Sequence, residues 1–498
     1  MTTAISPAPL NLTRIPQRFV SDDKRVITRY FDFGNPDRIR GILRRVMALP
    51  HDEVRQLFDE IAGEFRHRHH DLKAVFLDHF ANVARHLNGN GNGDPADLSI
   101  DQKLLIGAYF TLEYSIESAA LFNPSVVPHP NQDDVPEGSI RFLMSMRATG
   151  EGHISSIVFR RGIMTRDGQL SFDPAPRLAY TARPVPDRLY EKKLVFRKII
   201  EMGSYEDRAA QWLYGLPDTF TLGQATRFVH DIKANPDRPS TFDQMADDLL
   251  WVLRANYTLR FPADVWPSDT VIFPATEHES RGMEDLRLVR FLDDDGHARY
   301  LGTYTAYDGR HIVPMMLETD DFVTYHVSTL NGRFARNKGL ALFPRKIDGW
   351  HYAVSRHDGE NMFILKSDNR HFWNESEPLY QPREPWELVQ VGNCGSPLET
   401  DAGWILLTHG VGPVRRYCIG ALLLDKRDPT RIIGRLREPL IAPREDEREG
   451  YVPNVVYSCG ALIHHEQVFI PYAASDKATT FATIAVDDIT QRLLAEGP

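Results

Sequence analysis

Hydrophobic residues in the first quarter of the chain recur at the spacing of a helix. Within residues 37–86 apolar side chains return every three or four positions, as Ile42 and Val46 do. That period places them on one face of a helix. A second helical pattern follows at residues 101–122. The sequence therefore predicts a helical N-terminal extension over residues 1–120.

From Asn123 onward the hydrophobic period changes. Short runs rich in Val, Ile, Phe, Tyr and Thr alternate with turns, apart from a second helical stretch at about residues 186–258. Five of these β-rich segments share one order of strands and turns. Their later openings, near residues 285, 343, 395 and 454, lie roughly 50–60 residues apart, about the length of a four-stranded propeller blade. The pattern predicts a mainly β fold, a five-bladed β-propeller over residues 121–498 with a helical insertion after the first blade.

A propeller of this kind would bring polar residues together. The first strand of each blade lines the central axis. We therefore expect the residues that open the five segments to converge on one pocket, which suits a small polar ligand. These residues are Asn123, Asp285, Arg345, Ser396 and Asn454.

Composition narrows the class of protein. Hydrophobic residues make up 42% and charged residues 25% of the 498 positions, as in soluble globular proteins. The net charge of −10 argues against a nucleic-acid or anionic-membrane partner. No apolar run approaches the ~20 residues of a membrane helix, and the first residues lack a signal-peptide pattern. Three widely spaced cysteines, Cys394, Cys418 and Cys459, favour a reducing compartment, so we expect a cytoplasmic protein.

Acids, cations and aromatic residues are expected together in the pocket. Such a mixture suggests a carbohydrate ligand, because aromatic rings stack on sugar rings. The acids are Glu284, Asp285 and Asp476, with Glu399 as a fourth candidate. The cations and donors are Arg147, Arg287, Lys338, Arg356, His409 and the pair Arg415 and Arg416. The aromatic residues are Tyr307, Trp404, Tyr417, Tyr451 and Tyr472.

Two ways of breaking a glycosidic bond make different demands on such a site. Inverting hydrolysis needs an acid and a second carboxylate that activates water. Phosphorolysis uses phosphate as the nucleophile and needs two or three cations to hold it. Lys338, Arg356 and His409 would supply these cations beside Asp285, so the residues favour phosphorolysis.

Five separate motifs resemble glycoside hydrolase family 130, the family of β-mannoside phosphorylases and related β-mannosidases. They are Gly282-Met-Glu-Asp-Leu-Arg, Asn337-Lys-Gly-Leu-Ala-Leu-Phe-Pro-Arg-Lys-Ile, Gly403-Trp-Ile-Leu-Leu-Thr-His-Gly-Val, Gly420-Ala-Leu-Leu-Leu-Asp and Val452-Pro-Asn-Val-Val-Tyr-Ser-Cys-Gly. The resemblance covers about residues 121–490 without the helical insertion. It implies a five-bladed propeller and inverting chemistry on β-mannosides, with no metal or organic cofactor and with inorganic phosphate as co-substrate.

The resemblance also implies roles for single residues. Asp285 matches the family's general acid, which is thought to act through a mannose hydroxyl. The residues that would hold the mannosyl ring are Asn123, Ser125, Arg147, Glu284 and Asp476. The residues that would bind phosphate are Lys338 and Arg356, with His409 and Tyr417 as additions.

The chain departs from the family pattern at two positions. Leu286 stands where the family usually has proline, and Glu399 stands near a position where some phosphorylases have lysine. Glu399 would be the base if the enzyme were a hydrolase, so an inverting β-mannosidase is the second hypothesis. A non-enzymatic sugar-binding propeller is the third, and a furanoside-type glycosidase is a minor one. The linkage, the acceptor sugar, homo-oligomer formation and the role of the helical regions stay open.

Overall fold

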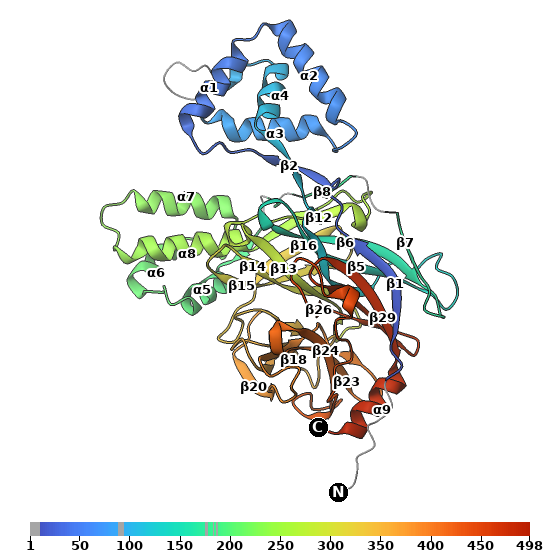
Figure 1. Ribbon diagram of the computed structural model, residues 1–498. Helices are drawn as coiled ribbons and strands as arrows, with labels where there is room; N and C mark the ends of the chain where they lie inside the picture. The colour runs from blue at the N-terminus through green and yellow to red at the C-terminus, as the bar shows by residue number, and fades with distance from the viewer. Residues whose placement is uncertain (1–9, 88–93, 175–177, 183, 186–187) are drawn as a thin grey trace. The chain divides into compact units, whose positions relative to one another are not determined.

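A computed structural model describes residues 10–87, 94–174, 178–182, 184–185 and 188–498 (Figure 1). The chain divides into two compact units. One contains residues 22–118 and 175–181, and the other contains the rest of the chain. None of the described helices has the length and apolar character needed to cross a membrane.

The smaller unit is mainly helical, as the period of its apolar residues predicts. Its helices are α1 (Pro36–Met47), α2 (His51–Phe65), α3 (Leu72–Ala84) and α4 (Ile100–Tyr109), and its strands β2 (Val26–Tyr30) and β3 (Thr111–Ser115) pair antiparallel. Helix α1 begins where Asn35 accepts the backbone N–H groups of Asp37 and Arg38, which satisfies groups that a helix start leaves unpaired. Leu43, Val83 and Phe110 are among the residues of its core.

The larger unit is mainly β, and its described strands form antiparallel groups along the chain. The first is β4 (Ala120–Pro128), β5 (Ile140–Thr149), β6 (Ser155–Met164) and β7 (Leu170–Phe172). The second is β13 (Gly282–Leu292), β14 (Ala298–Tyr307), β15 (Ile312–Thr319) and β16 (Thr324–Thr329), with β11 (Tyr257–Arg260) on its edge. Strand β12 (Thr270–Ile272) pairs with β6.

Three further groups follow. The third is β17 (Ala341–Leu342), β18 (His351–Ser355), β19 (Met362–Ser367) and β20 (Glu375–Tyr380). The fourth is β21 (Gln390–Asn393), β22 (Leu398–Glu399), β23 (Trp404–Val411), β24 (Tyr417–Leu424) and β25 (Ile432–Arg435). The fifth is β26 (Val456–Tyr457), β27 (Leu462–His464), β28 (Gln467–Ala474), β29 (Ala478–Ala485) and β1 (Thr13–Val20), and helix α9 (Val486–Glu496) ends the chain.

Each group packs against the next. Strand β4 contacts β13, β14 contacts β17, β18 contacts β21 and β24 contacts β26, and β28 of the fifth group returns to β4 of the first. Apolar side chains fill the seams between groups. Phe343, Val354 and Ile364 of the third group meet Trp404 and Leu406 of the fourth in one buried cluster. The mainly β class with helical regions is therefore confirmed.

The helical stretch expected at about residues 186–258 contains four helices in the described part of the chain. They are α5 (Lys192–Glu201), α6 (Asp207–Leu213), α7 (Leu222–Lys233) and α8 (Thr241–Ala255). The short strand β9 (Tyr190–Glu191) precedes α5 and pairs with β10 (Thr219–Phe220), which lies between α6 and α7. They enclose a core of their own that includes Phe220, Phe242 and Leu249.

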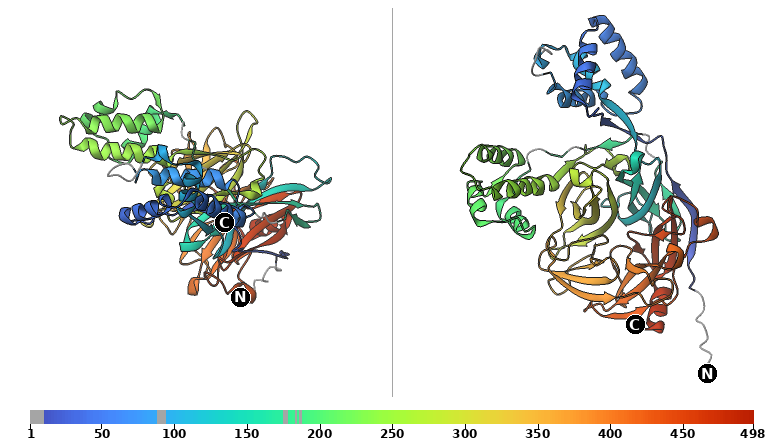
Figure 2. Two further views of the ribbon diagram at one scale, coloured as in Figure 1. Left: turned by 90° about the horizontal axis from the view of Figure 1, so that it is seen from above. Right: turned by 60° about the vertical axis from the view of Figure 1, so that its left-hand side comes forward.

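The N-terminal extension differs from the expectation in one respect. The division near residue 118 lies close to the predicted boundary at 120, but residues 13–20 are a strand and not part of a helical region. Strand β1 pairs antiparallel with β29, for example Thr13 with Thr483, and lies beside it in Figures 1 and 2. The reason is that β1 completes the outer edge of the fifth group. Its partner strand lies near the other end of the chain, so the pattern within residues 1–120 does not indicate the pairing.

Arg14 anchors this strand. Its guanidinium donates to Glu447 Oε2 at 2.5 Å, to the carbonyl of Ala442 at 2.7 Å and to Tyr472 Oη at 3.0 Å. The side chain of Glu447 is only 5% exposed. Removing its cationic partner would leave a buried carboxylate with fewer hydrogen bonds, which is costly.

We predict that Arg14→Met lowers the free energy of unfolding of the larger unit by about 1–3 kcal/mol. Denaturant unfolding followed by tryptophan fluorescence measures this unit alone, because all 7 tryptophans lie outside residues 22–118. Arg18→Met is the matched control, because Arg18 is exposed on the same strand. Equal effects of the two substitutions would contradict an anchoring role for Arg14.

Candidate active site

Two β-bulges bring Asn123 and Asp285 together. The register of β4 against β5 shifts between Phe122 and Ser125, and that of β13 against β14 shifts between Glu284 and Arg287. Asn123 and Asp285 adopt φ values of 49° and 57°, a left-handed conformation that Asn and Asp tolerate better than most residues. Asn123 Nδ2 donates to Asp285 Oδ1 at 2.7 Å. Bulges of this type often re-aim side chains at sites of function.

Arg147 and Lys338 hold the acidic pair in place. Arg147 Nη1 donates to Asp285 Oδ1 at 3.3 Å and Nη2 donates to Glu284 Oε1 at 2.9 Å. The Nε of Arg147 is fixed by Ser155 Oγ at 2.8 Å. Lys338 Nζ donates to Glu284 Oε2 at 2.5 Å. The sequence prediction that Asn123, Arg147, Glu284 and Lys338 lie around Asp285 thus agrees with the geometry.

Arg287 contacts the backbone of Asp285 from the buried interior. Its side chain is buried and donates to the carbonyl of Asp285 at 2.9 Å, to Asn393 Oδ1 at 3.1 Å and to Tyr457 Oη at 2.6 Å. It thereby joins the second, fourth and fifth strand groups. The prediction from the sequence includes Arg287 only as one of the cations of the pocket, and it does not include Asn393 or Tyr457. The one signal for Asn393 in the sequence is a polar side chain between Gly392 and Cys394 in a β-rich segment.

Burial and charge act in opposite directions on the pKa of Asp285. Burial raises it, but Arg147, Arg287 and Lys338 together with the Asn123 amide outweigh burial and hold it below its usual range. The carboxyl therefore binds a proton weakly as long as these cations are not neutralised by another anion.

Asp476 behaves in the opposite way. Burial and the neighbouring charge of Asp285 raise its pKa to about 7, and Arg147 and Arg415 offset only part of this. Asp476 follows β28 with a φ of 49°. It therefore lies close enough to Asp285 for the two carboxyls to influence one another, and it changes charge near neutral pH.

Arg356 carries unused hydrogen-bond donors. Its Nε and Nη1 are buried and have no partner in the described part of the chain. A buried guanidinium without a partner is costly. Its charge also acts on His409, because burial first, and then Arg356 and Arg287, lower the pKa of His409 well below its usual value. These nitrogens are available to an anionic ligand.

His409 is a neutral imidazole in a fixed orientation. The carbonyl of Asn393 lies 3.1 Å from Nδ1, so Nδ1 carries the proton and donates it. Tyr417 lies over the ring with centroids 6.0 Å apart, and its hydroxyl accepts a hydrogen bond from Gln390 Nε2 at 3.4 Å. His409 therefore offers Nε2 as an acceptor and not a positive charge.

Ser125, expected to hold the mannosyl ring, hydrogen-bonds within the protein instead. It is fully buried and its hydroxyl accepts the backbone N–H of Leu288 at 3.0 Å, which ties β4 to β13. Trp404 and Tyr472, expected as sugar-stacking surfaces, are likewise buried. Their place in the packed seams between strand groups explains the difference.

Three residues expected near Asp285 lie at the other end of the inner strands. Arg345, Ser396 and Glu399 line a cavity of about 300 Å³ together with Arg290. Arg290 is five residues beyond Asp285 on β13, about 16 Å at the ~3.3 Å rise of a strand. The expected convergence of Arg345 and Ser396 on the Asp285 pocket is therefore wrong. In the third group the opening lies earlier, near Lys338.

Glu399 has its own partner in that cavity. Its carboxylate accepts two hydrogen bonds from Arg345, at 2.7 and 2.8 Å, and this pairing is the main cause of its lowered pKa. The carbonyl of Asn454 accepts the N–H of Tyr417, whose ring lies beside that of His409, at 3.0 Å. Among the described residues, no three His, Cys, Asp or Glu side chains are arranged to hold a metal ion.

Known proteins share this sequence pattern. The model of the glycoside hydrolase 130 family, described as beta-1,4-mannooligosaccharide phosphorylase, matches residues 265–494. The 1,2-beta-oligomannan phosphorylase of Thermoanaerobacter sp. (strain X514) is 32% identical over 225 residues, which are 43% of this chain and 72% of that protein. The beta-1,2-mannobiose phosphorylase of Listeria innocua is 28% identical over 233 residues, 45% of this chain and 64% of that protein.

A solved structure of Listeria innocua beta-1,2-mannobiose phosphorylase with beta-1,2-mannobiose is also similar. The similarity covers 76% of this chain and 93% of that one, with a TM-score of 0.44 and 19% identity. On the sequence similarity above, the chain belongs to glycoside hydrolase family 130.

Proposed function

We propose that the protein catalyses the phosphorolysis of a β-mannoside with inversion, giving α-mannose 1-phosphate and a shortened acceptor. The observation that carries the proposal is that Nε and Nη1 of Arg356, near His409 and the Asp285 cluster, are buried and have no partner among the described residues. The phosphorylases of oligomannans and mannobiose to which the chain is similar support the same chemistry.

In this proposal the five strand groups are the blades of one closed propeller. The contacts of β28, β29 and β1 with β4 support closure between the last group and the first. The inner strands β4 and β13 then present Asn123 and Asp285 to the axis. We propose residues 121–498 as the catalytic domain, with β1 as an added edge strand.

Asp285 is the proton donor in this scheme. It gives a proton toward the glycosidic oxygen, by way of a mannose hydroxyl, as that bond breaks. Phosphate attacks the anomeric carbon from the opposite face, which inverts its configuration. Asn123 Oδ1 is buried without a partner in the described residues and can accept a sugar hydroxyl. Arg147, Glu284 and Asp476 complete the set of groups around the mannosyl ring.

The charges of the site couple phosphate binding to protonation. Arg147, Arg287 and Lys338 hold the pKa of Asp285 low. A phosphate dianion placed among Lys338, Arg356 and neighbouring donors would cancel part of this field, so Asp285 would bind its proton more tightly. Asp285 would then be protonated, and ready to act as the acid, when phosphate is bound. His409 and Tyr417 contribute neutral hydrogen-bonding groups.

Hydrolysis is the second candidate, and it has less support. It requires a carboxylate that faces a water next to the sugar, at roughly 6.5–9.5 Å from the acid. Glu399, the base expected from the sequence, is paired with Arg345 in the cavity at the other end of β13. The phosphorolytic scheme needs no such base.

We also propose a cytoplasmic location, which the three buried, unpaired cysteines support. No nucleic-acid or membrane partner is proposed for a chain with a net charge of −10. The linkage, the acceptor and homo-oligomer formation are matters for experiment.

We predict that β-mannobioses are cleaved only when phosphate is present. The measurement is mannose release from the 1→2, 1→3 and 1→4 isomers with and without inorganic phosphate, together with ³¹P NMR of the product. At least one isomer should give α-mannose 1-phosphate. Equal release of mannose without phosphate would favour the hydrolase instead.

We predict that Arg356→Met lowers kcat/KM for phosphate by about 10- to 150-fold, the loss of one charge-assisted contact of ~1.5–3 kcal/mol. The affinity for the β-mannoside should change little. Arg345→Met is the control, because Arg345 pairs with Glu399 at the far end of the strands. If the control lost as much activity, the assignment of Arg356 to phosphate would fail.

We predict that activity falls as the pH rises through about 7, the pKa of Asp476. Above that pH Asp476 is ionised and adds a negative charge next to Asp285 and the phosphate. Asp476→Asn stays neutral at every pH, so its profile of kcat/KM should lack this decline. A decline that persists in the variant would belong to another group, such as phosphate itself.

A further inference from the structure

A second cavity lies in the larger unit, between the helical insertion and the second strand group. Its volume is about 530 Å³, within the ~300–1,000 Å³ range of small-molecule sites. Helix α5, strands β15 and β16 and the loop after β19 supply its walls. We call it the α5 pocket, and its principal lining residues are Arg188, Leu194, Lys198, Glu318, His371 and Phe372.

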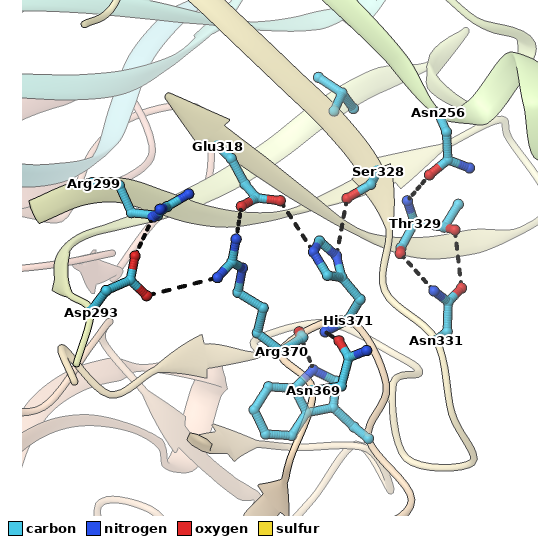
Figure 3. Close-up of polar contacts among 12 residues, drawn as sticks. Asn256, Asp293, Arg299, Glu318, Ser328, Thr329, Asn331, Asn369, Arg370 and His371 are labelled. Carbon is cyan, nitrogen blue, oxygen red and sulfur yellow. Dashed lines mark hydrogen bonds and ion pairs between the residues drawn. The ribbon is translucent and has the colours of Figure 1, made fainter. Parts of the chain in front are cut away.

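The carboxylates in the wall of the α5 pocket are already paired. Glu318 accepts Arg370 Nη2 at 2.8 Å and lies 3.3 Å from His371 Nε2 (Figure 3). In the same network, Asp293 accepts Arg299 Nε at 2.6 Å and also faces Arg370. These acids have little capacity left for a positively charged ligand.

The acids at the rim are either paired or exposed. Asp321 accepts the backbone N–H groups of Val323 and Thr324 at 2.8 and 2.9 Å. Glu191 and Asp320 are exposed to solvent. Salt screens exposed charges at distances near 8 Å, so these acids oppose an anion in the pocket only weakly.

The cations of the pocket are short of partners. Arg188 Nη1 donates to the carbonyls of Tyr257 and Val327 at 2.7 and 2.9 Å, but no carboxylate in the described part of the chain lies within ion-pair distance of it. Lys198 has one long contact, 3.4 Å to Glu201. Burial lowers the pKa of both groups despite the nearby acids. An anion would stabilise both charges.

The rest of the pocket suits a sugar. The side-chain amides of Asn256 and Asn331 border it and are fixed by hydrogen bonds to Thr329 (Figure 3). Each amide nitrogen has two N–H groups and one partner among the described residues, so one N–H stays available. Phe372 and Leu194 add apolar surface. Phosphate alone would leave most of the volume unfilled.

We propose that the α5 pocket binds a small phosphorylated sugar, with Arg188 and Lys198 contacting the phosphate and the amides contacting hydroxyl groups. This site is separate from Asp285 and is built by the helical insertion, for which the sequence offered no function. Because the proposed reaction produces a hexose 1-phosphate, the site would let the enzyme respond to its product or to a related sugar phosphate.

The experiment is isothermal titration calorimetry of α-mannose 1-phosphate, inorganic phosphate and mannose into an Arg356→Met variant. This background weakens phosphate binding near Asp285, and no turnover occurs without an acceptor. Lys198→Gln is added to remove one charge of the pocket, and Arg188→Lys to keep the charge while changing its geometry. Lys193→Gln is the matched control, because Lys193 is exposed on the same helix.

We expect α-mannose 1-phosphate to bind, and both pocket substitutions to weaken it about tenfold or more, while Lys193→Gln leaves it unchanged. Mannose should not bind in the pocket. Absence of binding in the Arg356→Met background, or binding that ignores both substitutions, would overturn the proposal. Inorganic phosphate binding as tightly as the sugar phosphate would overturn the part that concerns the sugar. The outcome does not depend on turnover, so it is distinguishable from failure of the proposed phosphorolysis.

Discussion

The arrangement around Asp285 depends on the arginines that hold it. A buried carboxylate is costly unless charges and hydrogen bonds compensate it. Arg147 contacts the side chains of Asp285 and Glu284, and Arg287 binds the carbonyl of Asp285 from the interior. Arg287 also reaches Asn393 and Tyr457, so the same group that stabilises the acid fixes three strand groups relative to one another. The geometry around Asp285 and the packing of the β unit thus rest on shared contacts.

This arrangement has a consequence for proton transfer. The cations that make burial of Asp285 tolerable also lower its pKa, which opposes a role as acid. A second anion among these cations resolves the conflict, because it reduces their effect on Asp285. Asp476, with a pKa of about 7, adjusts the same balance. In this account, phosphate is both the nucleophile and the ligand that prepares the proton donor.

Much of this organisation could be predicted from the sequence. The spacing of apolar residues predicts the helices of residues 22–118 and 192–255, and the repeated β-rich segments predict most of the strands. The acidic motif led to Asp285, and Arg147 and Lys338 were expected among the cations of its pocket before the family resemblance gave them roles. These features could be predicted because each is encoded in a short stretch of the chain.

Features that join distant segments could not be predicted in this way. Strand β1 pairs with β29, more than 450 residues later in the chain, and nothing in its own sequence names that partner. The likeness of their segments predicts Arg345 and Ser396 as openings, yet both line the cavity at the other end of the inner strands. The contacts of Arg287 with Asn393 and Tyr457, and the pairing of Glu399 with Arg345, likewise depend on how strand groups meet.

In the proposed mechanism Asp285 supplies the proton, whereas its neighbours only bind and position the β-mannoside and phosphate. The most direct measurement compares Asp285→Asn with the unchanged protein in both turnover and affinity for the preferred β-mannobiose. Asparagine keeps the shape and an acceptor for Asn123 but has no proton to give. We expect kcat to fall by about 10²–10⁴-fold while the Kd for the disaccharide changes only a few-fold. If the variant kept most of its turnover, Asp285 would not be the proton donor.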